Sequence, residues 1–358
     1  MYVDSVKLHL HNGSTFLDSE FRYVLFPVMY SIFFILGFFS NLYVLFVLWR
    51  LREARAMGEI CIYMTNLTIA DLLFVSALPF WISYYRREGD WIFNDFMCRM
   101  TGSFFFINTY GTILFLGAIS LNRYWAVTRP LDAASSDHRC RGIIVCTLIW
   151  ASTISTAILY MISTTKTKDK TKNKTRCFEG YQNKNDEEKR KVAVFNFLLI
   201  GMFFLVFFLV VICNFLIARA LIYQSAPQAT KARGLKKKAL QMLLAVVGVF
   251  VLCFLPHHIV QGPWTLAVLQ ITEGWGHVTW GQDTRQALND AHQITWVLMG
   301  LNCILDPVVY FFATRKFRSF IMEHIRMLSK GETISYTANT RISMNITVSS
   351  SSSILSNL

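Results

Sequence analysis

Seven long apolar runs dominate this chain and limit what it can fold into. Four contain no Asp, Glu, Lys or Arg, and a fifth is equally uncharged, with Pro256 near its middle and Gly262-Pro263 as its expected exit. The other two each hold one carboxylate, Asp71 and Asp306. All seven reach the roughly 20 residues that a helix needs to cross the hydrocarbon core of a membrane. In chain order the runs cover residues 23–49, 60–85, 100–122, 142–165, 192–218, 239–272 and 291–314.

Continuous hydrophobicity indicates that these runs are helices. A membrane-spanning barrel strand has about 10 residues of alternating polarity, a pattern that the runs lack. Only 16% of the residues are charged and 54% are hydrophobic, whereas a soluble domain carries about 25% charged residues. We therefore expect an all-α membrane protein, with a seven-transmembrane helix bundle over residues 23–314 that follows an N-terminal segment of residues 1–22.

Enzymes and transporters have signatures that this sequence lacks. It contains no His-Glu-x-x-His, Gly-x-Ser-x-Gly or Cys-x-x-Cys motif. A transporter, the alternative from another class, would show internal repeats and a charged path across the membrane, but no repeat is found and only two carboxylates lie in the runs. We expect neither an enzyme nor a nucleic-acid partner.

Glycosylation sequons favour one orientation in the membrane. Asn12-Gly13-Ser14 and Asn173-Lys174-Thr175 fall on the same predicted side of the bundle, and such sites are modified only outside the cytoplasm. We therefore place the N-terminus outside and the C-terminus in the cytoplasm, and we predict glycosylation at Asn12 and Asn173.

The cysteines predict one disulfide. Of eight cysteines, five lie in apolar runs and Cys140 lies on the predicted cytoplasmic side, where thiols stay reduced. Cys98 and Cys177 are the only two on the oxidising side. We therefore predict a disulfide between Cys98 and Cys177.

Polar residues inside the runs suggest a buried polar site, because ionisable groups in a membrane are costly. Asn302, Asp306 and Tyr310 recur every four residues and so share one face of the seventh helix. Facing the second and third helices, they would form an oxygen-rich core for a sodium ion. A water-filled hydrogen-bond network with one protonated carboxyl group is the alternative. The set for either arrangement is Asp71, Asn108, Thr112, Asn302 and Asp306.

The order of several motifs resembles the rhodopsin-like family of G-protein-coupled receptors, and the likeness extends to Lys330. The matching residues are Gly37 to Asn41, Asn66-Leu67 with Ala70-Asp71, Trp91 with Cys98, Trp150, Cys253-Phe254-Leu255-Pro256, and Asn302 with Asp306-Pro307-Val308-Val309-Tyr310. The resemblance implies a multi-pass receptor of the plasma membrane that needs no cofactor and couples to heterotrimeric G proteins. It also implies that coupling involves Asn122, Arg123, Tyr124, Phe254, Pro256 and Tyr310.

Two further segments follow the bundle. Residues 315–330 resemble the short amphipathic helix that lies on the inner leaflet in this family, where it contacts membrane lipids. Residues 331–358 are rich in Ser and Thr and poor in apolar residues, which predicts a disordered cytoplasmic tail that binds arrestin once phosphorylated.

More specific runs resemble the branch of this family that binds a choline ether phospholipid and signals through phospholipase C and calcium or through inhibition of adenylyl cyclase. These runs are Asp18 to Phe26, Phe105 to Tyr110, Pro256 to Gln261 with Pro263 to Ala267, and Asn289 to Gln293. Aromatic faces can hold a quaternary ammonium group, although plain packing also accounts for such rings, and His and Gln can bind phosphate or acyl oxygens. Another lipid or a peptide is the alternative ligand. The resemblance implies a pocket of Trp81, Phe105, Phe106, Phe178, His257, His258, Gln261 and Gln293.

Departures from the family pattern concern Arg123. Asn122 stands where an Asp is usual, and Lys236 stands where an acidic residue is common at the base of the sixth helix. Arg123 therefore lacks the two carboxylates that often restrain it in the resting receptor, and we expect raised ligand-independent signalling.

Replacing Asn122 by Asp should restore one restraint and lower basal signalling. An exposed ion pair contributes roughly 1 kcal/mol, so we expect about a fivefold fall. Inositol phosphate accumulation without agonist, at matched surface expression, measures this effect. Basal output that does not fall would contradict the expectation.

Overall fold

The structure is a computed structural model that describes only part of the chain. It covers residues 17–53, 59–129, 138–163, 166–169, 173–177, 185–223, 241, 244–269, 280–313 and 315–329. The predictions made for Asn12, Phe178 and the tail of residues 331–358 therefore lie outside the described residues.

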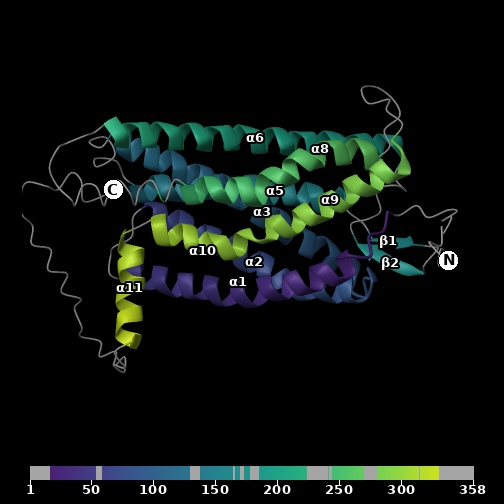
Figure 1. Ribbon diagram of the computed structural model, residues 1–358, viewed down its shortest axis with the longest axis horizontal. Helices are drawn as coiled ribbons and strands as arrows, with labels where there is room; N and C mark the ends of the chain where they lie inside the picture. The colour runs from purple at the N-terminus through teal and green to yellow at the C-terminus, as the bar shows by residue number, and fades with distance from the viewer. Residues whose placement is uncertain are drawn as a thin grey trace, which may run out of the picture.

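The described residues contain seven helices that are long and apolar enough to cross a membrane, which confirms the predicted bundle. Helices form here because lipid offers no hydrogen-bond partner to a polar backbone. They lie side by side along the long axis of the molecule (Figure 1). The spans are α1 (Arg22–Glu53), α2 (Glu59–Arg86), α3 (Asp95–Thr128), α5 (His138–Ser163), α6 (Asp186–Tyr223), a sixth over Leu244–Leu269 that ends in α8 (Leu255–Leu269), and a seventh made of α9 (Gln282–Gly300) and α10 (Asn302–Ala313).

The two ends of the bundle carry different elements. The predicted short helix after the seventh span is α11 (Arg315–Ser329), which lies across one end of the bundle in Figure 1. Its Phe320 ring packs 6.5 Å from the Phe46 ring of α1. At the other end lies a hairpin of β1 (Lys166–Asp169) and β2 (Lys174–Cys177). We call these ends the α11 end and the hairpin end.

The sixth span does not end at Gly262-Pro263, so that expectation was wrong. α8 continues through Pro263, because proline removes a single backbone hydrogen bond and neighbouring helices can satisfy the freed carbonyl group. Upstream lies a π-helical turn, η2 (Phe250–Phe254), closed by a hydrogen bond from the Leu255 N–H to the Phe250 carbonyl group. Such turns shift the register of the helix that follows them.

The seventh span also differs from the prediction. It begins at Gln282 rather than residue 291, because its first turns are polar and do not register in an apolar run. A turn at Leu301 separates α9 from α10, and the Leu301 N–H donates to the carbonyl groups of Val297 and Leu298, both at 3.2 Å. This break precedes Asn302, which is fully buried in the bundle.

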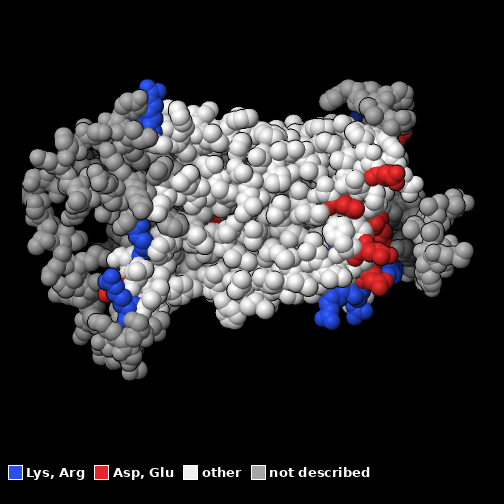
Figure 2. Space-filling view, viewed as in Figure 1, with Lys and Arg blue, Asp and Glu red and all other residues white. Residues whose placement is uncertain are grey.

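The bundle has an apolar surface between charged ends. Leu205 and Val24 are 73% and 71% exposed, and Figure 2 shows Lys, Arg, Asp and Glu gathered at the two ends of the face in view. Lipid accommodates such a surface. Close packing inside depends on Gly37 of α1, where an added Cβ would lie 3.0 Å from Val75 of α2 and 3.1 Å from Cys303 of α10.

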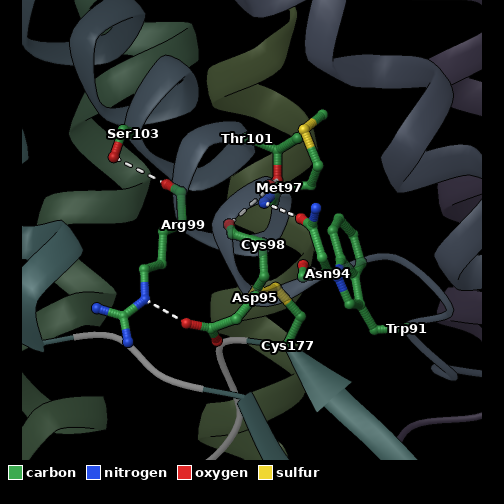
Figure 3. The surroundings of a disulfide bond; sticks show 9 residues. All are labelled: Trp91, Asn94, Asp95, Met97, Cys98, Arg99, Thr101, Ser103 and Cys177. Atoms are coloured by element: carbon green, nitrogen blue, oxygen red, sulfur yellow. Dashed lines mark hydrogen bonds and ion pairs between the residues drawn. A yellow bond between two sulfur atoms is a disulfide. The ribbon is translucent and has the colours of Figure 1, made fainter.

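The hairpin is fixed to α3 by a disulfide between Cys98 and Cys177, as predicted, with the two Cα atoms 6.0 Å apart (Figure 3). β1 and β2 pair antiparallel, with Lys166 opposite Cys177. The Trp91 N–H donates to the Thr175 carbonyl oxygen at 2.8 Å. The strands were not predicted, because their basic, polar residues give no apolar pattern.

A clasp of charged residues joins the N-terminal segment to the hairpin. Asp18 accepts hydrogen bonds from Arg22 of α1 at 3.0 Å, Arg176 of β2 at 3.1 Å and the Tyr23 hydroxyl group at 2.6 Å. Both arginines are only 1% exposed, so Asp18 supplies one carboxylate that two buried guanidinium groups share. Next to it, Ser19 donates to Asp290 of α9.

Replacing Asp18 by Asn should destabilise the protein by about 3 kcal/mol, because the change leaves two buried guanidinium groups without their carboxylate. The midpoint of thermal unfolding in detergent measures this loss. Replacing Glu20 by Gln, an exposed carboxylate of the same segment, is the control and should change little. Equal midpoints for the two variants would show that the clasp contributes no stability.

Candidate ligand cavity and polar core

A cavity lies among the helices in the half of the bundle nearest the hairpin. It contains about 650 Å³ of space, part of it open to solvent, and none of its described lining residues is Asp, Glu, Lys or Arg. The lining residues come from α2, α3, α5, α6, α8 and α9 and are Trp81, Gly102, Phe105, Phe106, Thr109, Tyr110, Tyr160, Phe195, Asn196, Leu199, His257, Gln261, Trp264, His292, Trp296 and Met299.

One side of the cavity is an aromatic wall of Trp81, Phe105 and Trp296. The rings of Phe105 and Trp296 stack with centroids 4.9 Å apart and planes 21° apart. Trp81 meets Trp296 edge to face at 6.5 Å. Aromatic faces attract cations through their ring quadrupoles, so this wall can bind a cation without a carboxylate.

Next to this wall lies a histidine wall of His257, Gln261 and His292, with the His292 ring 5.8 Å from the Trp296 ring. The rings of His257 and His292 lie 4.9 Å apart, and Trp264 stacks on His292 at 4.0 Å. The Gln261 Oε1 atom is buried and has no hydrogen-bond partner among the described residues. Imidazole and amide groups can both donate and accept hydrogen bonds, so this wall can bind polar groups of a ligand, and the Gln261 Oε1 atom is available as an acceptor.

The structure brings five of the eight predicted pocket residues together. Trp81, Phe105, Phe106, His257 and Gln261 line the cavity. His258 is not among the lining residues. It stacks on Phe203 at 3.9 Å, and its Nδ1 atom lies 2.8 Å from the Phe254 carbonyl oxygen. Gln293 is half-buried outside the lining, and Phe178 lies outside the described residues. That these residues bind a ligand stays a prediction.

Sequence reasoning missed several lining residues. Asn196 of α6 is a polar residue inside an apolar run, and its amide donates to Thr265 of α8 at 3.1 Å, so its polarity could have marked it. Trp296 follows His292 by four residues and therefore shares its helix face. Tyr160 and Phe195 gave no usable signal, because aromatic residues are common throughout the spans.

Below the cavity, a polar core joins α2, α3 and α10. Asn108 donates to the Asp71 carboxylate at 2.7 Å, and Asn302 donates to Asn108 and Thr112, both at 3.2 Å. Both oxygens of Asp306 are buried with no hydrogen-bond partner among the described residues. The structure therefore joins four of the five predicted residues by hydrogen bonds, and Asp306 follows Asn302 by four residues on the same helix face. Sodium binding here stays a prediction.

The predicted coupling residues occupy two positions in the bundle. Asn122, Arg123 and Tyr124 are half-buried in the last turns of α3, towards the α11 end. Phe254 and Tyr310 are fully buried in the core, and Pro256 lies in the first turn of α8. Their roles in coupling stay predictions.

Comparisons with known proteins place this arrangement in a family. Residues 40–310 match the family described as "7 transmembrane receptor (rhodopsin family)". That range includes the six described helices that line the cavity, and the polar core.

Individual relatives are similar over most of their length. The chain is 48% identical to the platelet-activating factor receptor of Mus musculus over 318 residues, which are 87% of this chain and 89% of that protein. It is 44% identical to the same receptor of Homo sapiens over 316 residues, with the same shares. It is also 31% identical to the cysteinyl leukotriene receptor 1 of Sus scrofa over 300 residues, 84% of each chain. The chain therefore belongs to the rhodopsin family of seven-transmembrane receptors.

Proposed function

We propose that this chain is a G-protein-coupled receptor for platelet-activating factor, a choline ether phospholipid. The observation that carries the proposal is the 48% identity with the Mus musculus receptor for that ligand over 87% of this chain. Because this similarity spans the bundle, it covers the cavity as well as the framework.

The chemistry of the cavity supports this ligand. Phosphocholine carries one positive and one negative charge, so its net charge of zero suits a lining without Asp, Glu, Lys or Arg among the described residues. The aromatic wall suits the trimethylammonium group, which cannot donate conventional hydrogen bonds. The histidine wall suits the phosphate or acetyl oxygens, which accept hydrogen bonds.

The hairpin end is proposed to face the outside of the cell. Disulfides persist in oxidising surroundings, and the Cys98–Cys177 disulfide is at this end. Asn173 is exposed in the turn between β1 and β2, where it is accessible for glycosylation. Asn12 is the second proposed glycosylation site.

The α11 end is then cytoplasmic and meets the signalling partners. We propose coupling to G proteins that activate phospholipase C and release calcium, or inhibit adenylyl cyclase. α11 would lie on the inner leaflet with its apolar face in lipid. Phosphorylation of residues 331–358 would recruit arrestin, and sodium in the polar core would act as an allosteric ion.

Platelet-activating factor at nanomolar concentration should release intracellular calcium in cells that express this chain. The same lipid without its acetyl group should release no calcium, because it lacks the acetyl carbonyl acceptor that the histidine wall is proposed to bind. Fluorescent calcium recording measures both responses, with mock-transfected cells as the control. If the protein reaches the surface and neither lipid acts, the ligand assignment is wrong and another lipid or a peptide is the ligand.

The aromatic wall should recognise the positive charge of choline. In the unaltered chain, replacing the trimethylammonium group of the ligand by an uncharged tert-butyl group should weaken binding about tenfold, within the range of cation–π contributions. In a Trp296→Leu variant the same replacement should weaken binding about threefold or less. Competition against radiolabelled ligand on membranes measures the ratio.

The control variant is Phe208→Leu, because Phe208 is 56% exposed on the outside of the bundle. It should keep the full discrimination between the charged and uncharged ligands. If Trp296→Leu and the unaltered chain discriminate equally between the charged and uncharged ligands, Trp296 does not contribute to the cation site.

A further inference from the structure

A buried carboxylate organises the α11 end of the bundle. Glu59, in the first turn of α2, is 6% exposed. Arg141 of α5 donates to it through Nε, 3.1 Å from each carboxylate oxygen, and through Nη2. Tyr63, one turn further along α2, donates its hydroxyl group to the same carboxylate. Glu59 is thus held by a forked guanidinium group and a phenol.

The same arginine also contacts α3. The Arg141 Cζ atom lies 4.0 Å from the centre of the Trp125 ring, a distance at which a guanidinium group and an indole face attract each other. Glu59, Arg141 and Trp125 therefore form a triad that joins α2, α5 and α3. Gly142 allows the close approach, because a Cβ there would lie 3.1 Å from the Glu59 Cγ atom.

The position of the triad relates it to coupling. Trp125 follows Arg123 by two residues, and its carbonyl oxygen accepts the hydrogen bond that ends α3, from the Arg129 N–H. Arg141 lies near the start of α5, the next helix among the described residues. The triad therefore ties together the two helices on either side of residues 130–137 and fixes the last turn of α3.

We propose that the Glu59–Arg141–Trp125 triad is a positioning device for the G protein. It holds the Asn122–Tyr124 turn in one arrangement before the partner arrives. A partner that meets a preformed surface does not have to order that surface on binding, so its affinity is higher. The triad touches none of the cavity-lining residues in the contacts described above, so it should act on coupling and leave ligand affinity unchanged. The inference rests on the proposed function only in taking a G protein as the partner.

The test measures guanine nucleotide exchange on a purified phospholipase C-activating G protein, titrated against the full-length receptor in lipid nanodiscs. Trp125→Leu and Arg141→Gln should each raise the half-saturating G-protein concentration about tenfold, equivalent to about 1.4 kcal/mol. The double variant should show no further shift, because either change alone breaks the triad. Trp125→Phe, which keeps an aromatic face, should restore most of the affinity.

Controls separate positioning from folding and from direct contact. Arg139→Gln removes an exposed guanidinium group from the same helix and should leave exchange unchanged. Thermal unfolding midpoints and binding of radiolabelled platelet-activating factor without G protein identify variants that are merely misfolded. Additive shifts in the double variant would mean that Trp125 contacts the G protein itself, and they would overturn the proposal, as would unchanged half-saturation in folded single variants.

Exchange is measured with and without the lipid. A wrong ligand assignment would abolish the lipid response and leave the shift in basal exchange in place. If the triad does not position the coupling surface, the lipid response should stay intact and the variants should show no shift in the half-saturating G-protein concentration.

Discussion

The hydrocarbon core of a membrane offers no hydrogen-bond partner, and this constraint shapes the whole molecule. Backbone groups are satisfied within helices, and polar side chains that lie in the spans must find partners inside the bundle. Asn108 does so by joining Asp71 to Asn302 and thereby α2 and α3 to α10. The Asp306 oxygens are buried and have no hydrogen-bond partner among the described residues. The polar core therefore links the helices and also holds acceptors that those residues do not use.

The cavity and the α11 end are built by opposite means. The cavity has an uncharged described lining of aromatic rings, imidazoles and amides. The α11 end instead uses an ion pair between the buried Glu59 and the half-buried Arg141, which is stronger than a fully exposed pair because Glu59 is shielded from water. An uncharged cavity can bind a zwitterion without leaving a net charge buried. An ion pair with several hydrogen bonds, in contrast, holds its helices in one geometry. In the proposed receptor, the cavity would bind the ligand and the ion pair would hold the coupling surface in one arrangement.

The sequence was sufficient for the bundle and for the disulfide. Apolar runs mark spans because burial in lipid is set by composition, and Cys98 had one available partner in its compartment.

Helix ends were less predictable. α9 begins in polar residues that lie beyond an apolar run, and α8 passes through Pro263 because surrounding helices compensate for the lost hydrogen bond. Within the cavity, His257 and Gln261 were predicted from the family resemblance and line the cavity. His258 instead stacks on Phe203, because adjacent residues point about 100° apart on a helix. The contact between Trp296 and Phe105 could not be predicted from the sequence, because the two rings belong to different helices, α9 and α3.

The most direct test of the proposed function is an electron cryo-microscopy structure of the full-length receptor bound to platelet-activating factor and a G protein. The account predicts lipid density inside the bundle, with the trimethylammonium group against Phe105 and Trp296 and the phosphate or acetyl oxygens towards His257 and His292. An empty cavity, or lipid density only on the outer surface of the helices, would contradict it.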